Sequence, residues 1–265
     1  MESRSVRGPA QERQGGGERS AVAVDPALLD ALAVRIADLG REIGLPYIAA
    51  SADISSSAPL TDSRGQPLAE TLFRWIDPDL QYWRERGFAL KAPFVIALRY
   101  AAEPFYFHDG GFASWRPQPW LEAMEVAERA MEHGVGGAII APVHLPGGAV
   151  GGVVWATDRP RRDLPEVYAA RASELHAAAI RFIAACHDSA GWRAEPARLT
   201  PREVQCLKWA AAGKTDADIA QIVGISMSTT RFHIRNATAK LGAVGRAQAI
   251  HRASALGYIG PVRGP

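Results

Sequence analysis

The spacing of apolar residues predicts three amphipathic helices in the first 190 residues of the chain. The first begins at Asp25, because an aspartate caps a helix well and Pro26 fits the first turn. Its apolar side consists of Leu28, Leu29, Leu32, Ile36 and Leu39. A second helix is predicted over residues 119–134. Its apolar stripe consists of Trp120, Met124, Ala127 and Met131. The third and longest spans residues 164–187.

Apolar runs bounded by turn residues predict a sheet. Residues 46–55 favour a strand, and residues 138–145 and 149–157 favour a hairpin because a Pro-Gly-Gly turn joins them. In between, residues 80–86 predict a short helix and residues 92–101 a helical or mixed segment. The order helix, strand, helices, hairpin, helix predicts an α+β fold in which helices cover both sides of an antiparallel sheet.

The last part of the chain has a purely helical pattern. Thr200 precedes Pro201 and Glu203, which is the signature of a capping box at the start of a helix. Four helices, separated by glycines, are predicted over residues 201–212, 216–223, 226–241 and 246–256. We therefore divide the chain into a disordered tail (1–20), a first domain (21–188), a linker (189–198) and an all-α domain (199–265).

Charge is distributed unevenly between the two domains. The chain has a net charge of +2, but residues 199–265 contain nine Lys and Arg against three Asp and Glu, so the rest is net negative. Such an asymmetry indicates one module that meets a polyanion and one that does not. Cys186 and Cys206 have no partner at metal-ligand spacing, and we expect no metal or cofactor. With neither a signal peptide nor an apolar run of membrane-spanning length, the chain is expected in the cytoplasm without a membrane partner.

The predicted helix over residues 226–241 has two distinct sides. The side that should face a core consists of Thr230, Ile234, Ala237 and Leu241. Arg231, Phe232 and Arg235 project elsewhere, and an arginine can donate two hydrogen bonds to guanine in the major groove of DNA. Candidate phosphate contacts are Lys214, Ser228, Thr229, Asn236 and Lys240. The alternative is that both arginines are solvated surface charges. The tight turn at residues 224–226, the excess of positive charge and the four helices together favour DNA binding.

With this pattern, residues 199–259 resemble the DNA-binding domain of the LuxR family of bacterial transcription regulators. The family's signature Glu, Leu and Gly are present as Glu203, Leu207 and Gly213. The three outward residues of the third helix fall where the family reads DNA. Because the following helix forms a dimer contact in relatives, the resemblance implicates residues 246–256 in a homodimer. Such a dimer would read a pseudo-palindromic operator in double-stranded DNA.

Residues 25–185 resemble the autoinducer-binding domain of quorum-sensing LuxR-type regulators. The resemblance rests on the order of elements, on YWRERGFALKAP (82–93), on EPFYF (103–107) and on the glycine-rich hairpin (134–156). It implies an α/β/α sandwich with an acyl-homoserine lactone buried between the sheet and the helices.

The resemblance also implies ligand-contacting positions, several of which depart from the family pattern. The motif Trp-x3-Tyr-x8-Asp-Pro aligns with Asp79, Trp83, Ala92 and Pro93, and a shift of one residue brings in Tyr82. A further family Trp aligns with Phe107. The candidate ligand-binding residues are Trp75, Asp79, Tyr82, Trp83, Phe88, Ala92, Val95, Phe107, Ala138 and Val154. We expect the aromatic members of this set, together with Trp155, to line a cavity rich in aromatic side chains.

These departures predict an unusual signal. Ala92 cannot accept the lactone amide N–H, and Phe107 has no N–H to donate. Each buried hydrogen bond left unmade costs about 1–3 kcal/mol. We therefore expect a dimeric orphan regulator with a small, mostly apolar signal, lactone-like or aromatic, and little response to ordinary acyl-homoserine lactones. The alternative is a ligand-independent regulator whose first domain serves only dimerisation or partner binding. No enzyme is expected, because none of the seven histidines has a nucleophile placed beside it.

Overall fold

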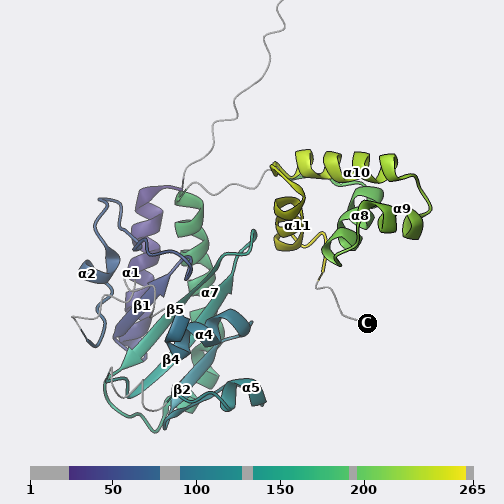
Figure 1. Ribbon diagram of the computed structural model, residues 1–265. Coiled ribbons are helices and arrows are strands. Elements are labelled where there is room, and N and C mark those ends of the chain that lie inside the picture. Colours follow the sequence, from purple (N-terminus) through teal and green to yellow (C-terminus); the bar gives the residue numbers. More distant parts are fainter. Residues whose placement is uncertain (1–23, 78–89, 127–133, 191–195, 261–265) are drawn as a thin grey trace, which may run out of the picture.

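The computed structural model describes residues 24–77, 90–126, 134–190 and 196–260 (Figure 1). The expected tail (1–20) and the expected short helix (80–86) lie outside the described residues. In the described part, no helix combines the length and apolar character needed to span a lipid bilayer.

A five-stranded sheet organises the N-terminal part, and every neighbouring pair of strands in it is antiparallel. The strand order is β1-β5-β4-β2-β3. The strands are β1 (Tyr47–Ser51), β2 (Phe105–His108), β3 (Gly111–Ala113), β4 (Gly137–His144) and β5 (Val150–Thr157). The predicted β4–β5 hairpin and antiparallel sheet are confirmed. The pair β2–β3 was not predicted, because its two strands are only four and three residues long.

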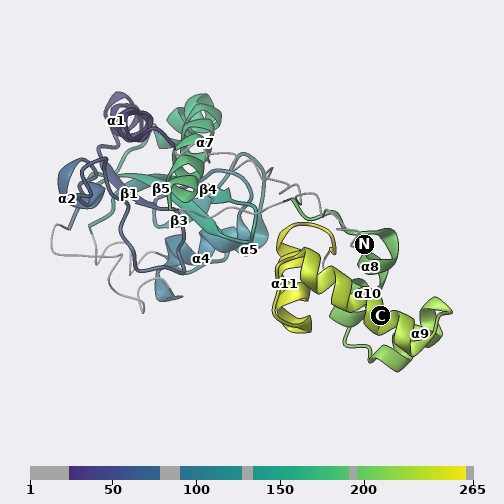
Figure 2. The same ribbon diagram turned by 90° about the horizontal axis from the view of Figure 1, so that it is seen from above.

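Helices cover the two faces of this sheet separately (Figure 2). One face carries α1 (Pro26–Glu42) and α7 (Leu164–Ser189), and the other carries the shorter helices α4 (Pro93–Tyr100) and α5 (Pro119–Glu122). One further short helix, α2 (Leu68–Thr71), lies between β1 and α4 in the chain. As predicted, the carboxylate of Asp25 caps α1 by accepting a hydrogen bond from the N–H of Ala27 at 3.0 Å. The α+β sandwich is therefore confirmed.

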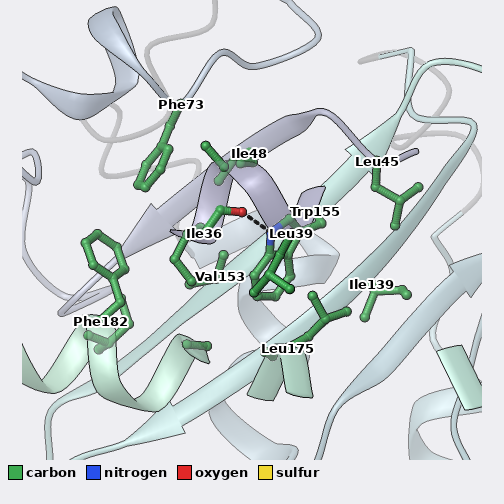
Figure 3. Close-up of a cluster of buried hydrophobic side chains, with 14 of the residues drawn as sticks. Ile36, Leu39, Leu45, Ile48, Phe73, Ile139, Val153, Trp155, Leu175 and Phe182 are labelled. Carbon is green, nitrogen blue, oxygen red and sulfur yellow. Dashed lines mark hydrogen bonds between the residues drawn. The ribbon is translucent and has the colours of Figure 1, made fainter. Parts of the chain in front are cut away.

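The α1 and α7 face forms a closely packed core around Trp155 (Figure 3). This side chain is fully buried, and its indole N–H donates to the carbonyl of Ile36 at 2.9 Å. Gly40 permits this approach, since a Cβ there would lie 2.9 Å from the Trp155 ring and 2.7 Å from the carbonyl oxygen of Leu45. The expectation that Trp155 joins a ligand cavity with Phe107 is wrong, because the two side chains lie on opposite faces of the sheet.

The predicted helix over residues 119–134 is wrong in its second turn. Helix α5 ends at Glu122, and residues 123–126 are not helical; residues 127–133 lie outside the described part. The buried apolar residues here are Leu121 and Val126, whereas Trp120 is 40% exposed. Residues five apart point to different sides of a helix with 3.6 residues per turn. Burial of both Leu121 and Val126 against the sheet therefore requires the chain to leave the helix.

The C-terminal part contains the four predicted helices α8 (Pro201–Ala211), α9 (Asp216–Val223), α10 (Met227–Lys240) and α11 (Arg246–Ala255). The capping box of α8 is confirmed: Thr200 Oγ1 accepts from the N–H of Glu203, and the Glu203 carboxylate accepts from the N–H of Thr200. Gly224 ends α9 at a φ of 69°, a left-handed conformation that costs glycine little. A chain turn of only Gly224–Ser226 then separates α9 from α10.

Candidate DNA-binding and signal-binding sites

Helix α10 has the two sides that the sequence predicts. Thr230, Ile234, Ala237 and Leu241 are all buried against the neighbouring helices. On the outer side, Arg231, Phe232 and Arg235 are exposed, and the guanidinium carbon of Arg235 lies 5.9 Å from the centre of the Phe232 ring. An apolar ring beside a cation costs little to desolvate and can contact a thymine methyl group. This side thus offers donors and apolar surface of the kind used to read base edges.

Hydroxyl groups at the start of α10 bond to one another. Ser226 caps the helix by accepting from the N–H of Thr229 at 3.1 Å, and its Oγ lies 2.7 Å from Ser228 Oγ and 2.8 Å from Thr229 Oγ1. Ser228 is exposed and Thr229 is partly buried. The two predicted phosphate contacts therefore sit together at a helix N-terminus, which favours anions. Asn236, the third predicted contact on this helix, is partly buried two turns further on.

The ammonium group of Lys240 has a partner within the protein. Its Nζ lies 2.9 Å from both carboxylate oxygens of Glu203, a side chain that is only 3% exposed. Burial raises the pKa of Glu203, but the hydrogen bond from Thr200 and the charge of Lys240 outweigh it and hold that pKa below its ordinary value. Lys240 thus compensates a buried charge, a role that the prediction of a phosphate contact did not include. Lys214, by contrast, is exposed in the turn before α9.

One carboxylate that the sequence did not single out joins three helices. Asp216 at the start of α9 accepts from Arg231 Nε at 3.3 Å and from Arg246 Nη1 at 2.6 Å. Arg246 also donates to the carbonyl of Lys214. These side chains border an open groove of about 660 Å³, which Met227 also lines. Sequence spacing carries no signal for this cluster, since its members are 15 and 30 residues apart.

The candidate signal-binding residues that lie in the described part gather on one face of the sheet. Phe107 on β2 is opposite Ala138 on β4, and Ala138 is opposite Ala156 on β5. Val154 lies on the same face, two residues from Ala156, and Trp75 packs against this cluster. All of these belong to the core on the α4 and α5 side, apart from the core of Trp155.

Helix α4 supplies the other two candidates. Ala92 is buried and is the N-cap of α4, but its methyl group makes no capping hydrogen bond. Val95, one turn along, is partly buried. The remaining candidates, Asp79, Tyr82, Trp83 and Phe88, lie outside the described residues. The described candidates are therefore apolar apart from the indole N–H of Trp75, and no carboxylate stands at the start of α4.

The described residues give little support for metal binding or for catalysis by a cysteine nucleophile. No group of three or more His, Cys, Asp or Glu side chains there could hold a metal ion. Cys186 and Cys206 are both buried, and burial raises the pKa of Cys186 to about 12 and also raises that of Cys206. Neither thiol is therefore activated as a nucleophile. His108 Nδ1 lies 3.5 Å from Asp109 Oδ2, at the turn between β2 and β3.

A sandwich domain with an apolar sheet face, followed by a helix-turn-helix unit with a cationic outer side, defines a sensor-type DNA-binding regulator. A family model described as bacterial regulatory proteins, luxR family, matches residues 197–253, and a model described as autoinducer binding domain matches residues 30–186. The chain belongs to the LuxR family of bacterial regulatory proteins and carries that family's autoinducer-binding domain.

Curated relatives are named as transcription regulators. The chain is 30% identical to the transcriptional activator protein PhzR of Pseudomonas fluorescens over 182 residues, covering 68% of this chain and 71% of that protein. It is 35% identical to VjbR of Brucella ovis, an HTH-type quorum sensing-dependent transcriptional regulator, covering 51% of this chain and 52% of that protein. To the transcriptional activator protein VanR of Vibrio anguillarum it is 56% identical over 63 residues, covering 24% of this chain and 26% of that protein.

The matched segment thus spans about a quarter of VanR and about half of VjbR. Among solved structures, SdiA in complex with octanoyl-rac-glycerol is similar with a TM-score of 0.48 and 21% identity, covering 86% of this chain and 88% of that chain.

Proposed function

We propose that the chain acts as a homodimeric transcription regulator that reads a pseudo-palindromic operator through α10 and senses a small, mostly apolar signal through its N-terminal domain. In this proposal residues 21–188 form the sensor domain, residues 189–198 the linker and residues 199–265 the DNA-binding domain. The signal differs from an ordinary acyl-homoserine lactone. The sheet core and the helix-turn-helix core are separate, so each domain can perform its part of this function.

The observation that carries the DNA-binding part is the division of α10 into a buried stripe and an exposed side with Arg231, Phe232 and Arg235. The buried stripe fixes the rotation of the helix about its axis. Both guanidinium groups therefore project from a rigid support, as base reading requires. Lys214, Ser228, Thr229 and Asn236 would then contact phosphates, with Lys240 also bound to Glu203.

The signal-binding part rests on the apolar face built from Phe107, Ala138 and Val154 and on the start of α4 at Ala92. None of these four side chains can accept or donate a hydrogen bond, so a buried amide gains nothing from them. An apolar or aromatic molecule loses no hydrogen bonds on entering such a site. A signal that binds only the folded, DNA-competent dimer would shift the population toward it.

The DNA-binding part is tested with a library of duplexes that carry a randomised 20-base-pair segment, from which the full chain selects its preferred sequence. We expect Arg231→Ala/Arg235→Ala to lose that preference, by at least about tenfold in affinity for the selected duplex, since a bidentate contact to guanine contributes about 1–3 kcal/mol. The control Arg202→Ala/Lys208→Ala removes the same charge from exposed positions of α8. Unchanged preference in the arginine variant overturns the proposal.

The signal-binding part is tested by thermal melting of the full chain with N-octanoyl-homoserine lactone and with octyl benzoate, an apolar aromatic probe. We expect stabilisation by the second probe only; a probe at 100 times its Kd adds about 2.7 kcal/mol. Tight capture of the lactone contradicts the proposed signal class. Full operator binding with no response to either probe supports the ligand-independent alternative instead.

Ala92→Asp restores a carboxylate at the start of α4 and sharpens this test. We expect the variant to gain affinity for the lactone of about tenfold, because one buried amide N–H then finds an acceptor. An aspartate at an N-cap also stabilises the helix itself, by about 0.5–2 kcal/mol. The melting temperature without lactone measures that second effect, so the increment caused by the lactone can be separated from it.

A further inference from the structure

A single carboxylate on α9 holds two arginines from the two following helices. Asp216 accepts from Arg231 Nε on Oδ2 at 3.3 Å and from Arg246 Nη1 on Oδ1 at 2.6 Å. Arg246 donates its other terminal nitrogen to the carbonyl of Lys214. The two arginines lie on different helices, and within the described part of the chain Asp216 accepts a hydrogen bond from each of them. The cluster therefore links the start of α9, the outer side of α10 and the start of α11.

The contact between Asp216 and Arg246 is shorter and less exposed than the contact between Asp216 and Arg231. The exposed fraction of the side chain falls from 62% for Arg231 to 35% for Arg246 and 25% for Asp216. The Asp216–Arg246 distance is 2.6 Å, against 3.3 Å for Asp216–Arg231. Arg246 is additionally tied to the backbone at Lys214. Asp216 is thus the less exposed acceptor, and Arg231 is the more exposed partner that donates to it.

The atom through which Arg231 is held decides which of its edges can read a base. A guanidinium group has five N–H donors, of which one is on Nε and four are on Nη1 and Nη2. Asp216 engages the Nε donor. The end-on pair of donors on Nη1 and Nη2, which matches O6 and N7 of guanine, is not used by this contact.

We propose that Asp216 is a specificity-determining positioning residue: anchored by Arg246, it holds Arg231 Nε so that the Nη edge faces a guanine rather than a backbone phosphate. This proposal rests on the proposed function of α10. The charge of Asp216 also repels phosphates, so it lowers the affinity for arbitrary DNA while it raises discrimination between sequences. Asp216 itself contacts no base in this scheme; it acts through Arg231.

The test compares Asp216→Asn with Asp218→Asn in the full chain. Each variant removes one negative charge from the first turn of α9, but the Asp218 carboxylate accepts from the N–H and the hydroxyl of Thr215 instead of from an arginine. Duplexes selected from the randomised 20-base-pair library and shuffled duplexes of the same composition are the probes. We expect Asp216→Asn to lose about tenfold in preference for the guanine read by Arg231, while its affinity for shuffled duplexes stays equal or rises. We expect Asp218→Asn to keep the preference.

A double-mutant cycle with Arg231→Ala separates positioning from a merely structural role. In the Arg231→Ala background, Asp216→Asn should change no base preference, because the side chain that it positions is gone. A structural role predicts a lower melting temperature and a loss that persists in that background, and this result overturns the inference. If the double arginine variant loses its preference but Asp216→Asn does not, this inference fails and the proposed function stands. If neither variant loses it, both fail.

Discussion

Two adjacent cross-strand pairs in the same hairpin show how differently the two faces of the sheet are built. Ile139 is opposite Trp155 on the face covered by α1 and α7, whereas Ala138 is opposite Ala156 on the face covered by α4 and α5. The first pair is large and the second is small. Because side chains alternate along a strand, neighbouring residues of one hairpin can serve two different environments.

The contrast extends to the covering helices. Among the described residues, the face with Trp155 is covered by helices of 17 and 26 residues, and the other face by helices of eight and four. A ring of ion pairs between α1 and α7 closes the outside of the first face, where Glu42 binds Arg35 and Arg171, and Glu174 binds the same two arginines. The first face therefore has the features of a structural core. The second combines the small side chains of Ala138 and Ala156 with larger ones such as Phe107, and it carries the candidate signal-binding residues.

The largest expected effect is on the closely packed face. Trp155→Ala should lower the free energy of unfolding by about 3–5 kcal/mol, because it leaves a large cavity and removes the hydrogen bond to Ile36. Urea unfolding followed by circular dichroism measures this. Val154→Ala, the next residue but on the other face, removes fewer buried atoms and should cost about 1 kcal/mol. Equal losses would contradict the difference between the faces.

An intermediate effect is expected when a small side chain on the face covered by α4 and α5 is replaced by a larger one. Ala138→Leu should change the free energy of unfolding by less than about 1 kcal/mol and abolish stabilisation by the apolar probe, because the leucine occupies the space proposed for the signal. Ile139→Trp on the opposite face should cost about 1–3 kcal/mol through overpacking. If Ala138→Leu is as costly as Ile139→Trp, then the second face is packed as closely as the first.

The smallest effect is chemical and concerns Cys186, a member of the core beside Trp155. Its pKa of about 12 leaves almost no thiolate at pH 7–9, so alkylation by iodoacetamide should be slow and almost independent of pH over that range. Cys206→Ala leaves this thiol as the single one in the chain. In urea the rate should rise with a midpoint near 8.5, the pKa of a free cysteine. The same midpoint in the folded protein would show that this core opens readily.

Elements with strong local patterns could be predicted from the sequence. The cap at Asp25, the β4–β5 hairpin and the capping box of Thr200 and Glu203 each depend on residues within a few positions of one another, and all three are confirmed. The prediction of a helix over 119–134 was wrong because it also rested on local spacing alone. That spacing favoured Trp120 as the inner residue, whereas the sheet buries Leu121 and Val126. Tertiary burial overrides a local apolar stripe.

The outer side of α10 was largely encoded in local spacing, because the residues that must be buried leave Arg231, Phe232 and Arg235 on the outside. The electrostatic partners of the charged residues on α10 could not be predicted from local spacing. That Lys240 neutralises the buried Glu203, and that Asp216 holds Arg231, depends on helices brought together by folding. Electrostatic partners are set by distance in space, to which sequence separation gives no guide.

The sequence by itself determined the family, the first and last helices of the sandwich with the β4–β5 hairpin, the four helices of the C-terminal part, and which side of α10 faces the core, because each is specified by periodicity, capping residues or a motif. Only the tertiary structure decided that Trp155 lies with α1 while Val154 lies with α4, and which carboxylate meets which arginine. The physical reason is that sheet register and helix packing, which bring distant residues within a few ångströms, arise from the whole core at once.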